Sequence, residues 1–328
     1  MARSGLVRGL IGIAISVAAF ALILRQVDLA RTADVLATAN PGWVAFMVGM
    51  TSADLVLRAW RWQRLLAPIH LVRVPRMFAY LAVGYAANNV LPARLGELVR
   101  SHYLGDREGI SRTTTLGTVV VERVVDTGMV VAIASLSIVI LQVRGLIANA
   151  VLVGLAVVGL LVVLLAFLIV AHRLPGADRV TSFAARWPRV QDLAGKPRTL
   201  AQAIILSAAA WTATILGFAA GAQALGVQLT LAQTALLASG TALATAIPAG
   251  PGNLGTYDLA AATIAQTLGV PVNTAFAIAL ITHASTLLVT TVAGSVALLR
   301  LGWARPAGEG RPDDPAAPPV LSGRSAED

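Results

Sequence analysis

The sequence contains no cysteine, and Lys196 is the only lysine among its 25 basic residues. Without cysteine the chain cannot form a disulfide, use a thiol nucleophile or bind a metal ion through thiolates. Charge of either sign is also scarce, because charged residues make up 12% of the 328 residues, against about 25% in an average soluble domain. Hydrophobic residues make up 57%, and the mean hydropathy is +0.76. The composition therefore predicts an all-α polytopic membrane protein.

The net charge of +9 comes almost entirely from arginines that lie between apolar segments. In a membrane protein such arginines report topology and contact with anionic lipid head groups, so we expect no nucleic-acid partner. The four histidines lie at positions 70, 102, 172 and 283, a spacing that matches no recognisable metal site. We therefore predict no metal site and no cofactor.

Six apolar segments are long enough to cross a bilayer, which needs roughly 20 residues. They are residues 1–24, 41–57, 113–142, 145–171, 200–224 and 273–299. The basic segment that starts at Arg58 and the basic segment 172–198 are interpreted as cytoplasmic loops, with the tryptophans of the first at the membrane interface. Residues 1–303 form one predicted transmembrane domain, and the polar residues 304–328 form a predicted disordered cytoplasmic tail.

Two further apolar regions, 77–105 and 231–270, are each interrupted by helix breakers near the middle. If every apolar segment crossed once, the basic loop 172–198 would lie outside the cell, against the positive-inside rule. If both regions instead enter and leave on one side, both termini are cytoplasmic and the protein is a multi-pass protein of the cell membrane. We predict six spanning helices and two re-entrant or broken hairpins; the alternative is eight or more full spans.

The two interruptions share a pattern, Pro92-x-x-Leu95-Gly96 and Pro251-x-x-Leu254-Gly255. The predicted helix-break residues are Pro92, Gly96, Pro248, Pro251, Gly252 and Gly255. Each interruption lies between two spans, so residues of about 41–142 and 200–299 form two similar units that face opposite ways across the membrane. Inverted repeats with broken helices that meet near the midplane are typical of transporters.

The first break carries Arg94, Glu97 and Arg100, which would lie on one face of a helix and could neutralise one another. One interpretation is a head-group site, in which the arginines bind phosphate and Glu97 balances them or binds a proton or an amine. The other interpretation is a charge cluster that anchors the hairpin at the membrane interface.

The span that follows carries Glu122, Arg123 and Asp126, one turn apart on a helix. They could form an ion-pair network that holds this span against the first hairpin, or they could contribute to a functional site. On the second span, Asp54 and Arg58 are also one turn apart, and their pairing would lower the cost of an acid in the bilayer.

The second break carries Asn253, Tyr257 and Asp258. Asp258 is the only charged residue between Thr199 and Arg300, which favours a functional role for it. Capping of freed backbone groups is the simpler role for Asn253 and for the asparagines before the first break. His283 in the last span could relay protons or could simply bond within the helix bundle.

Through several of these residues, the chain resembles the transmembrane region of the lysylphosphatidylglycerol synthase family, the flippase-like proteins. The resemblance rests on the segments 57–62, 92–100, 122–126 and 248–255. In that family a soluble domain aminoacylates phosphatidylglycerol, and the membrane region is thought to move the product between leaflets. No soluble domain is expected after residue 299, so the resemblance implies lipid movement rather than lipid synthesis.

We therefore predict a lipid transporter, with a phospholipid or a polyprenyl-phosphate type of lipid as its partner. The predicted substrate-binding residues are Arg94, Glu97, Arg100, Glu122, Arg123, Asp126, Asn253, Tyr257 and Asp258. One alternative is a membrane-embedded transferase that uses a paired acid as a general base, although no nucleophile or metal motif supports an enzyme. The other alternative is a partner subunit of an enzyme of envelope lipid synthesis.

Overall fold

The computed structural model describes residues 2–91, 95–145, 149, 197–245 and 249–302 of the chain. Every regular element in these residues is a helix, so the predicted all-α class is confirmed. The predicted span 145–171, most of the basic loop 172–198 and the predicted tail 304–328 lie outside the described residues.

We call residues 41–142 the first half and residues 197–302 the second half. The described residues of the first half form the helices α3 (Pro41–Leu66), α4 (Val74–Val90), α5 (Gly96–Glu108) and α6 (Arg112–Leu141). Helix α3 begins at an N-cap, Asn40, whose side chain accepts hydrogen bonds from the next turn, and its first position is a proline, which suits a helix start. The long helix α6 is apolar over most of its second half, and it ends at a left-handed C-cap.

The second half contains α10 (Pro197–Ala224), α11 (Leu231–Ala244), α12 (Thr256–Thr267) and α13 (Val272–Leu301). Helix α11 starts with a capping box, in which the side chain of the N-cap threonine and that of a glutamine bond each other's backbone. A short 3-10 helix, η2 (Pro251–Asn253), precedes α12 and forms the second break.

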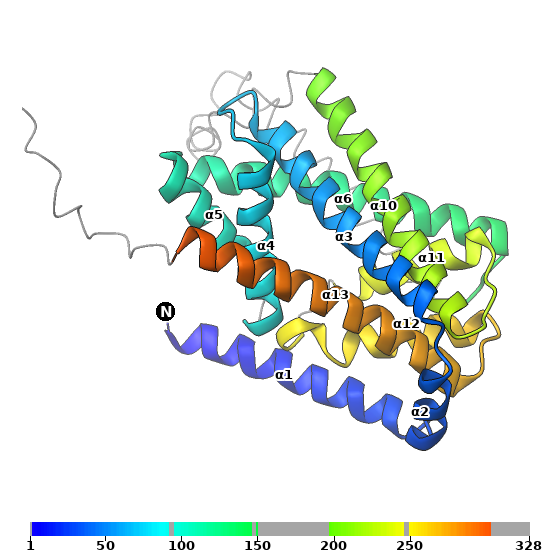
Figure 1. Ribbon diagram of the computed structural model, residues 1–328. Coiled ribbons are helices and arrows are strands. Elements are labelled where there is room, and N and C mark those ends of the chain that lie inside the picture. The colour runs from blue at the N-terminus through cyan, green and yellow to red at the C-terminus, as the bar shows by residue number, and fades with distance from the viewer. Residues whose placement is uncertain (1, 92–94, 146–148, 150–196, 246–248, 303–328) are drawn as a thin grey trace, which may run out of the picture.

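Two more helices precede these halves, α1 (Ala2–Leu24) and α2 (Leu29–Ala37), and they meet at an angle of 84°. Helix α1 packs against α12, and the Ser16 hydroxyl accepts a hydrogen bond from the Gly250 amide at 2.8 Å. Helix α1 therefore covers the second break from outside the two halves (Figure 1).

The helix contacts of one half have counterparts in the other. Helix α4 packs against α13 as α11 packs against α6, and α3 packs against α6 as α10 packs against α13. The most extensive contact joins α3 to α10, which are the corresponding helices of the two halves. This pattern is the one expected of two repeated units.

The two halves run in opposite directions through the bundle. The backbone amide of Asn40, at the start of α3, donates to the carbonyl of Ala224 at the end of α10, at 2.8 Å. Near the other end of the pair, Arg61 of α3 donates to Ser207, early in α10. Helices α3 and α10 are therefore antiparallel, as they are for inverted repeats (Figure 1).

Three described helices are long and apolar enough to cross a membrane without a break, at Thr114–Leu141, Pro197–Ala224 and Val272–Leu301. Helix α3 contains 26 residues and is therefore longer than about 35 Å, which is enough to cross a bilayer. It also carries charged side chains along its second half. The predicted loop after Arg58 is wrong, because α3 continues as a helix to Leu66. Trp62 is fully buried in the bundle instead of lying at the membrane interface.

The first hairpin has the geometry of a re-entrant element. Helices α4 and α5 contain 17 and 13 residues, which give lengths of about 26 and 20 Å, against a hydrocarbon core of roughly 30 Å. They are antiparallel, since Tyr80 near the start of α4 donates to Glu108 at the end of α5 at 2.7 Å. A side chain on Gly96 would collide with the carbonyl of Gly84 across the hairpin, so this close approach requires glycine.

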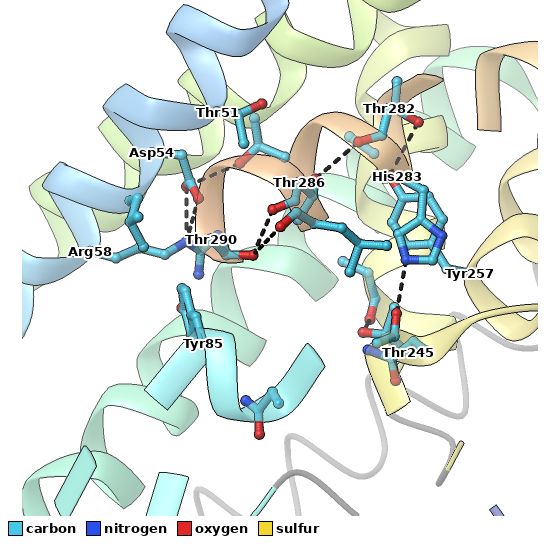
Figure 2. A pocket seen from close by; sticks show the side chains of 18 of the residues that line it. Thr51, Asp54, Arg58, Tyr85, Thr245, Tyr257, Thr282, His283, Thr286 and Thr290 are labelled. Carbon is cyan, nitrogen blue, oxygen red and sulfur yellow. Dashed lines mark hydrogen bonds and ion pairs between the residues drawn. The ribbon is translucent and has the colours of Figure 1, made fainter. Parts of the chain in front are cut away.

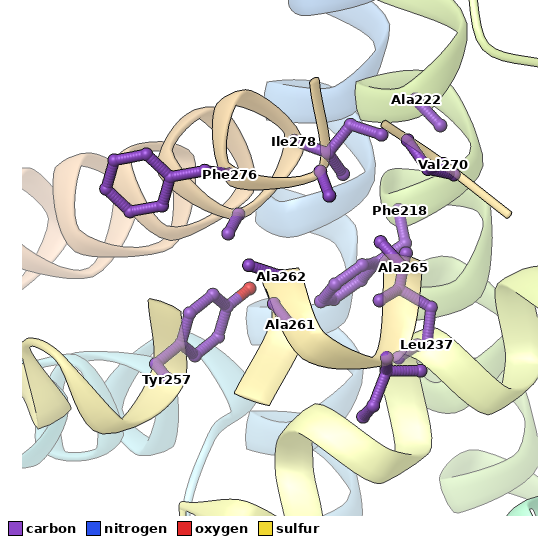
Figure 3. Packing of buried hydrophobic residues seen from close by; sticks show 14 of the residues in the cluster. Phe218, Ala222, Leu237, Tyr257, Ala261, Ala262, Ala265, Val270, Phe276 and Ile278 are labelled. Carbon is purple, nitrogen blue, oxygen red and sulfur yellow. The ribbon is translucent and has the colours of Figure 1, made fainter. Parts of the chain in front are cut away.

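The second hairpin is shorter still, with 14 residues in α11 and 12 in α12. Its inner faces pack with α10 and α13 in a cluster of small and aromatic side chains, including Phe218, Tyr257 and Phe276 (Figure 3). The η2 turn contacts the end of α4, and a Cβ on Gly252 would lie 3.6 Å from the Asn89 carbonyl oxygen. The tips of the two hairpins therefore meet inside the bundle, as predicted for broken helices.

Candidate functional site

A cavity of about 700 Å³ lies where the two hairpin tips meet. Both halves contribute to its wall: α3, α4, α5 and α6 on one side, and α10 to α13 with the η2 turn on the other. Figure 2 shows Asp54 and Arg58 at one end of this pocket and Tyr257 and His283 at the other. The charged and titratable groups on its wall are Asp54, Arg58, Tyr85, Glu97, Arg123, Asp126, Tyr257 and His283.

One side of the cavity is formed by ion pairs on α3 and α6. The Arg58 Nε donates to both oxygens of Asp54, at 2.9 and 2.8 Å, as the spacing of one helical turn predicts. Its Nη1 donates to Asp126 Oδ2 at 2.9 Å. Asp126 Oδ1 accepts a further bond from the Trp211 ring nitrogen at 3.1 Å. These charge-assisted bonds fix the side chains of α3, α6 and α10 against one another.

Behind this wall lies a second layer of charges that the cavity does not reach. Arg61 is fully buried, and its guanidinium donates to Asp126 at 2.7 Å and to Glu122 at 2.8 Å. The Arg100 Nη2 lies 2.9 Å from the other Glu122 oxygen, and its guanidinium lies over the Trp62 ring at 4.7 Å. Buried charges are tolerated only when they are paired in this way, so this layer joins α3, α5 and α6 firmly.

The ion pair between Glu97 and Arg123 is the most accessible of the pairs that line the cavity. The Arg123 Nη2 lies 2.7 Å from Glu97 Oε1, and the two side chains are 31% and 25% exposed. The Arg123 Nε is buried without a hydrogen-bond partner. The pair joins α5 of the first hairpin to α6, and it is the pair that a ligand could exchange with least loss of protein structure.

The eight charged residues described so far form a balanced set, which we call the ion-pair network. Its cations are Arg58, Arg61, Arg100 and Arg123, and its anions are Asp54, Glu97, Glu122 and Asp126. The predicted link between the span 113–142 and the first hairpin is thus present, but its pairs differ from those expected. Glu97 and Arg100 each pair with α6 and not with each other, and Asp126 pairs with α3 and not with Arg123.

The second break has a different chemistry, which we call the histidine site. His283 Nδ1 lies 2.9 Å from Asp258 Oδ1, and Nε2 lies 2.8 Å from the carbonyl oxygen of Gly252. The other Asp258 oxygen accepts a hydrogen bond from the backbone amide of Gly255 at 3.0 Å. The Tyr257 ring stacks on His283 with centroids 4.1 Å apart, and its hydroxyl donates to Thr282.

The asparagines at the breaks mainly satisfy polar groups of the protein. Asn88 accepts a hydrogen bond from the Gly96 amide at 2.8 Å, which caps the start of α5. Asn89 donates to Thr290 and Thr291 of α13, each at 2.8 Å. Asn253 has a positive φ of 55° and lies on the cavity wall. The capping role predicted for the residue at 88 is confirmed.

The predicted substrate-binding residues are thus divided by the structure. Glu97, Arg123, Asp126, Asn253 and Tyr257 line the cavity, whereas Arg100, Glu122 and Asp258 lie behind its wall. Arg94 and the breakers Pro92 and Pro248 lie outside the described residues.

Sequence reasoning missed the part that Arg58, Arg61 and Trp211 play in this site. For the two arginines a signal was present, because both lie within the segment 57–62 that carries the family resemblance. The spacing predicts the pair of Asp54 with Arg58, but the basic run from Arg58 onward also predicts a loop, so the sequence gives no partner on α6 for either arginine. No sequence pattern marks Trp211, because only the contact of α10 with α6 brings it to Asp126.

An apolar groove of about 420 Å³ runs beside the cavity on the outer side of α3, α4 and α13. It is lined by Val48, Ser52, Leu55, Val56, Phe78, Leu288, Val289, Val292 and Ala293. Leu55 lines both the groove and the cavity, so the two spaces adjoin each other at this side chain. Among the described residues, no group of three His, Asp or Glu side chains is placed to hold a metal ion.

These features define a polytopic helical membrane protein with two opposed broken hairpins around a central polar cavity. The sequence profile of the lysylphosphatidylglycerol synthase TM region matches residues 9–294, and the chain belongs to that family. The chain is also 30% identical over 135 residues to a UPF0104 membrane protein of Methanothermobacter thermautotrophicus. That match covers 40% of this chain and 40% of the archaeal protein, so it supports membership of a membrane-protein family and nothing finer.

Proposed function

We propose that this protein moves a lipid between the two leaflets of the cell membrane. The observation that carries the proposal is a cavity of about 700 Å³ with charged residues on its wall, beside an apolar groove of about 420 Å³ that shares Leu55 with it. A lipid has the same division into a polar head group and apolar chains. The head group would occupy the cavity, and a chain would remain in the groove between α3, α4 and α13.

The most accessible pair offers a site for the head group. Arg123 has an unused, buried Nε and can bind a phosphate oxygen, while Glu97 can bind a cationic part of the head group or remain as a counter-charge. The proposed substrates are phospholipids or polyprenyl-phosphate lipids, both of which carry a phosphate next to apolar chains.

Transport fits the site better than catalysis does. A general base needs a carboxylate that is free to accept a proton from substrate. Asp126 accepts from two arginines and a tryptophan, and Glu122 is held between two arginines. These acids are structural counter-charges, so a membrane-embedded transferase is the weaker proposal. A partner enzyme of envelope lipid synthesis stays a prediction.

The arrangement of basic residues supports cytoplasmic termini. One end of the bundle, where α3 ends, α10 begins and α13 ends, carries the exposed arginines Arg73, Arg76, Arg107, Arg112, Arg198 and Arg300. The positive-inside rule places this end in the cytoplasm. The last turn of α13 and the N-terminus both lie at this end (Figure 1), and the first hairpin enters from it.

The proposal is tested by reconstituting the purified protein in vesicles that contain a trace of tail-labelled fluorescent phosphatidylglycerol or phosphatidylethanolamine. A membrane-impermeant reductant bleaches the outer leaflet, so loss of the remaining signal reports movement. We expect movement with the native protein and at least a tenfold slower rate with Arg123→Ala, which removes a charge-assisted contact worth about 1.5–3 kcal/mol.

Arg31→Ala is the matched control, because Arg31 is an exposed arginine of α2 whose side chain is 77% exposed. It should leave the rate unchanged. Equal rates in protein-free and protein-containing vesicles with both lipids would contradict unaided lipid movement. Equal rates for Arg123→Ala and Arg31→Ala would place the path outside this cavity.

A further inference from the structure

The histidine site contains a group whose bonding partners define its protonation state. His283 is 4% exposed and lies on the cavity wall, and both of its ring nitrogens are within hydrogen-bond distance of an oxygen. One oxygen belongs to Asp258, whose other oxygen already accepts a backbone amide. The other is the carbonyl of Gly252 in the η2 turn, which can only accept.

A neutral imidazole has one donor nitrogen and one acceptor nitrogen, so it cannot donate to two acceptors. The protonated ring donates at both nitrogens and satisfies both oxygens. Donation to both oxygens therefore requires the imidazolium form of His283, with Asp258 as its counter-ion and with the Tyr257 ring stacked on its face.

Loss of the proton would change the turn at the second break. The carboxylate is the stronger acceptor, so the remaining proton would stay between Nδ1 and Asp258. The lone pair of Nε2 would then face the lone pairs of the Gly252 carbonyl at 2.8 Å, which is repulsive. Gly252 has a φ of 63°, and its turn touches the end of α4 at Asn89, so this turn forms the contact between the two hairpin tips.

We propose that His283 is a proton-binding site, and that release of its proton separates the η2 turn from α4 and so couples lipid movement to a proton gradient. This inference rests on the proposed function for its physiological meaning, but the protonation step itself does not. The proton leaves Nε2 for water in the cavity and returns by the same route. No other reactant is needed, and no bond other than N–H is broken.

The helices around His283 carry other charged and titratable groups. On α12 they are Asp258 and Tyr257; across the cavity they are Asp54 and Arg58 on α3, Tyr85 on α4, Glu97 on α5, and Arg123 and Asp126 on α6. Helix α10 has no acidic or basic residue after Arg198. The arginines and acids of the cavity are joined in ion pairs, so His283 is the group there that exchanges its proton without breaking an ion pair of the network.

The first test measures the protonation of the His283 ring nitrogens directly. The chain contains only four histidines, so ¹⁵N-histidine labelling of the full chain in lipid nanodiscs gives few signals, and His283→Gln identifies the one of interest. We expect both ring nitrogens of His283 to be protonated at low pH and one to lose its proton as the pH rises. A ring that keeps one tautomer at all pH values would overturn the proposal.

The second test measures the distance between the two hairpin tips. Because the chain has no cysteine, Val90→Cys and Leu254→Cys create a unique pair for spin labels, at side chains that are 70% and 52% exposed. Distances between the two spin labels are measured by pulsed electron paramagnetic resonance at low and high pH. We expect the short-distance population to be lost at high pH in the otherwise native chain.

The matched variant carries His283→Gln with the same labels, since glutamine is neutral at every pH. Its distances should not depend on pH. A pH response of equal size with and without the histidine would overturn the proposal, as would an unchanged distance in the chain that retains it. Neither experiment requires transport, so a protein that passes both and moves no lipid would contradict the proposed function alone.

Discussion

The two breaks occupy matching places in the two halves, yet they are built from different chemistry. The first adjoins the ion-pair network, with four arginines and four acids on α3, α5 and α6. The second has a single acid, Asp258, and a single histidine, in a half that is otherwise almost free of charge. The helices of the two halves thus pack in corresponding ways around the cavity, while the side chains at the two breaks differ.

Because of this difference, we expect the first break to stay in one arrangement and the second break to change with the protonation of His283. Removing one partner from a buried ion-pair network leaves an uncompensated charge, which is strongly unfavourable, so the first side is expected to stay in one arrangement. The histidine site depends instead on the single proton that we propose His283 to bind and release. Movement of the second hairpin against a rigid first half is the simplest alternation that this asymmetry supports.

The largest expected effect tests the rigidity of the first side. Arg61→Met leaves Glu122 and Asp126 each with one partner fewer in a fully buried position, and should destabilise the fold by about 3–5 kcal/mol. Asp258→Asn should cost much less, because asparagine keeps an oxygen for the His283 ring or the Gly255 amide. Thermal unfolding of both variants in detergent gives the comparison. A larger loss for Asp258→Asn would reverse the assignment of the two sides.

The next effect concerns the packing of the first hairpin. Gly96→Ala forces a methyl group against the Gly84 carbonyl, and overpacking of this kind costs about 1–3 kcal/mol. Gly49→Ala is the matched control, because a Cβ there meets no atom within 4 Å and alanine favours the helix. Thermal unfolding should separate the two variants. Equal stability would mean that α4 and α5 do not approach as closely as described.

A smaller effect tests the cap at the first break. Asn88→Ala removes the acceptor for the Gly96 amide at the start of α5, and loss of such a cap costs about 0.5–2 kcal/mol. Asn88→Asp keeps an oxygen in place and should recover most of the stability. If aspartate is no better than alanine in the same unfolding assay, the side chain does not cap the helix.

The smallest expected effect lies in the second half. Tyr257→Phe removes the hydroxyl that donates to Thr282 at 3.2 Å but keeps the ring stacked on His283, so the cost should be about 0.5–1.5 kcal/mol. The ¹⁵N signals of the histidine should keep their pH dependence. A change in that dependence as large as the one caused by Asp258→Asn would show that the hydroxyl controls the proton.

Much of the fold followed from the sequence, because hydrophobic length, charge between spans and helix breakers each have a direct physical meaning in a bilayer. The short helices on either side of Gly96 and the antiparallel relation of the halves were predicted in this way. The end of α3 was not, because the arginines at 58 and 61 look like a loop until their acidic partners on α6 are placed beside them. The pairing of Glu97 with Arg123, and the position of His283 on the cavity wall, likewise depend on contacts between distant helices.

In the proposed function, a lipid head group crosses through the cavity between the two hairpin tips. The direct test uses the Val90→Cys and Leu254→Cys pair in vesicles, with a reducible bifunctional thiol reagent that joins the tips. We predict that lipid movement stops when the reagent is added and returns when it is cleaved, whereas each single-cysteine variant is unaffected. Lipid movement at the native rate with the tips joined would contradict the account.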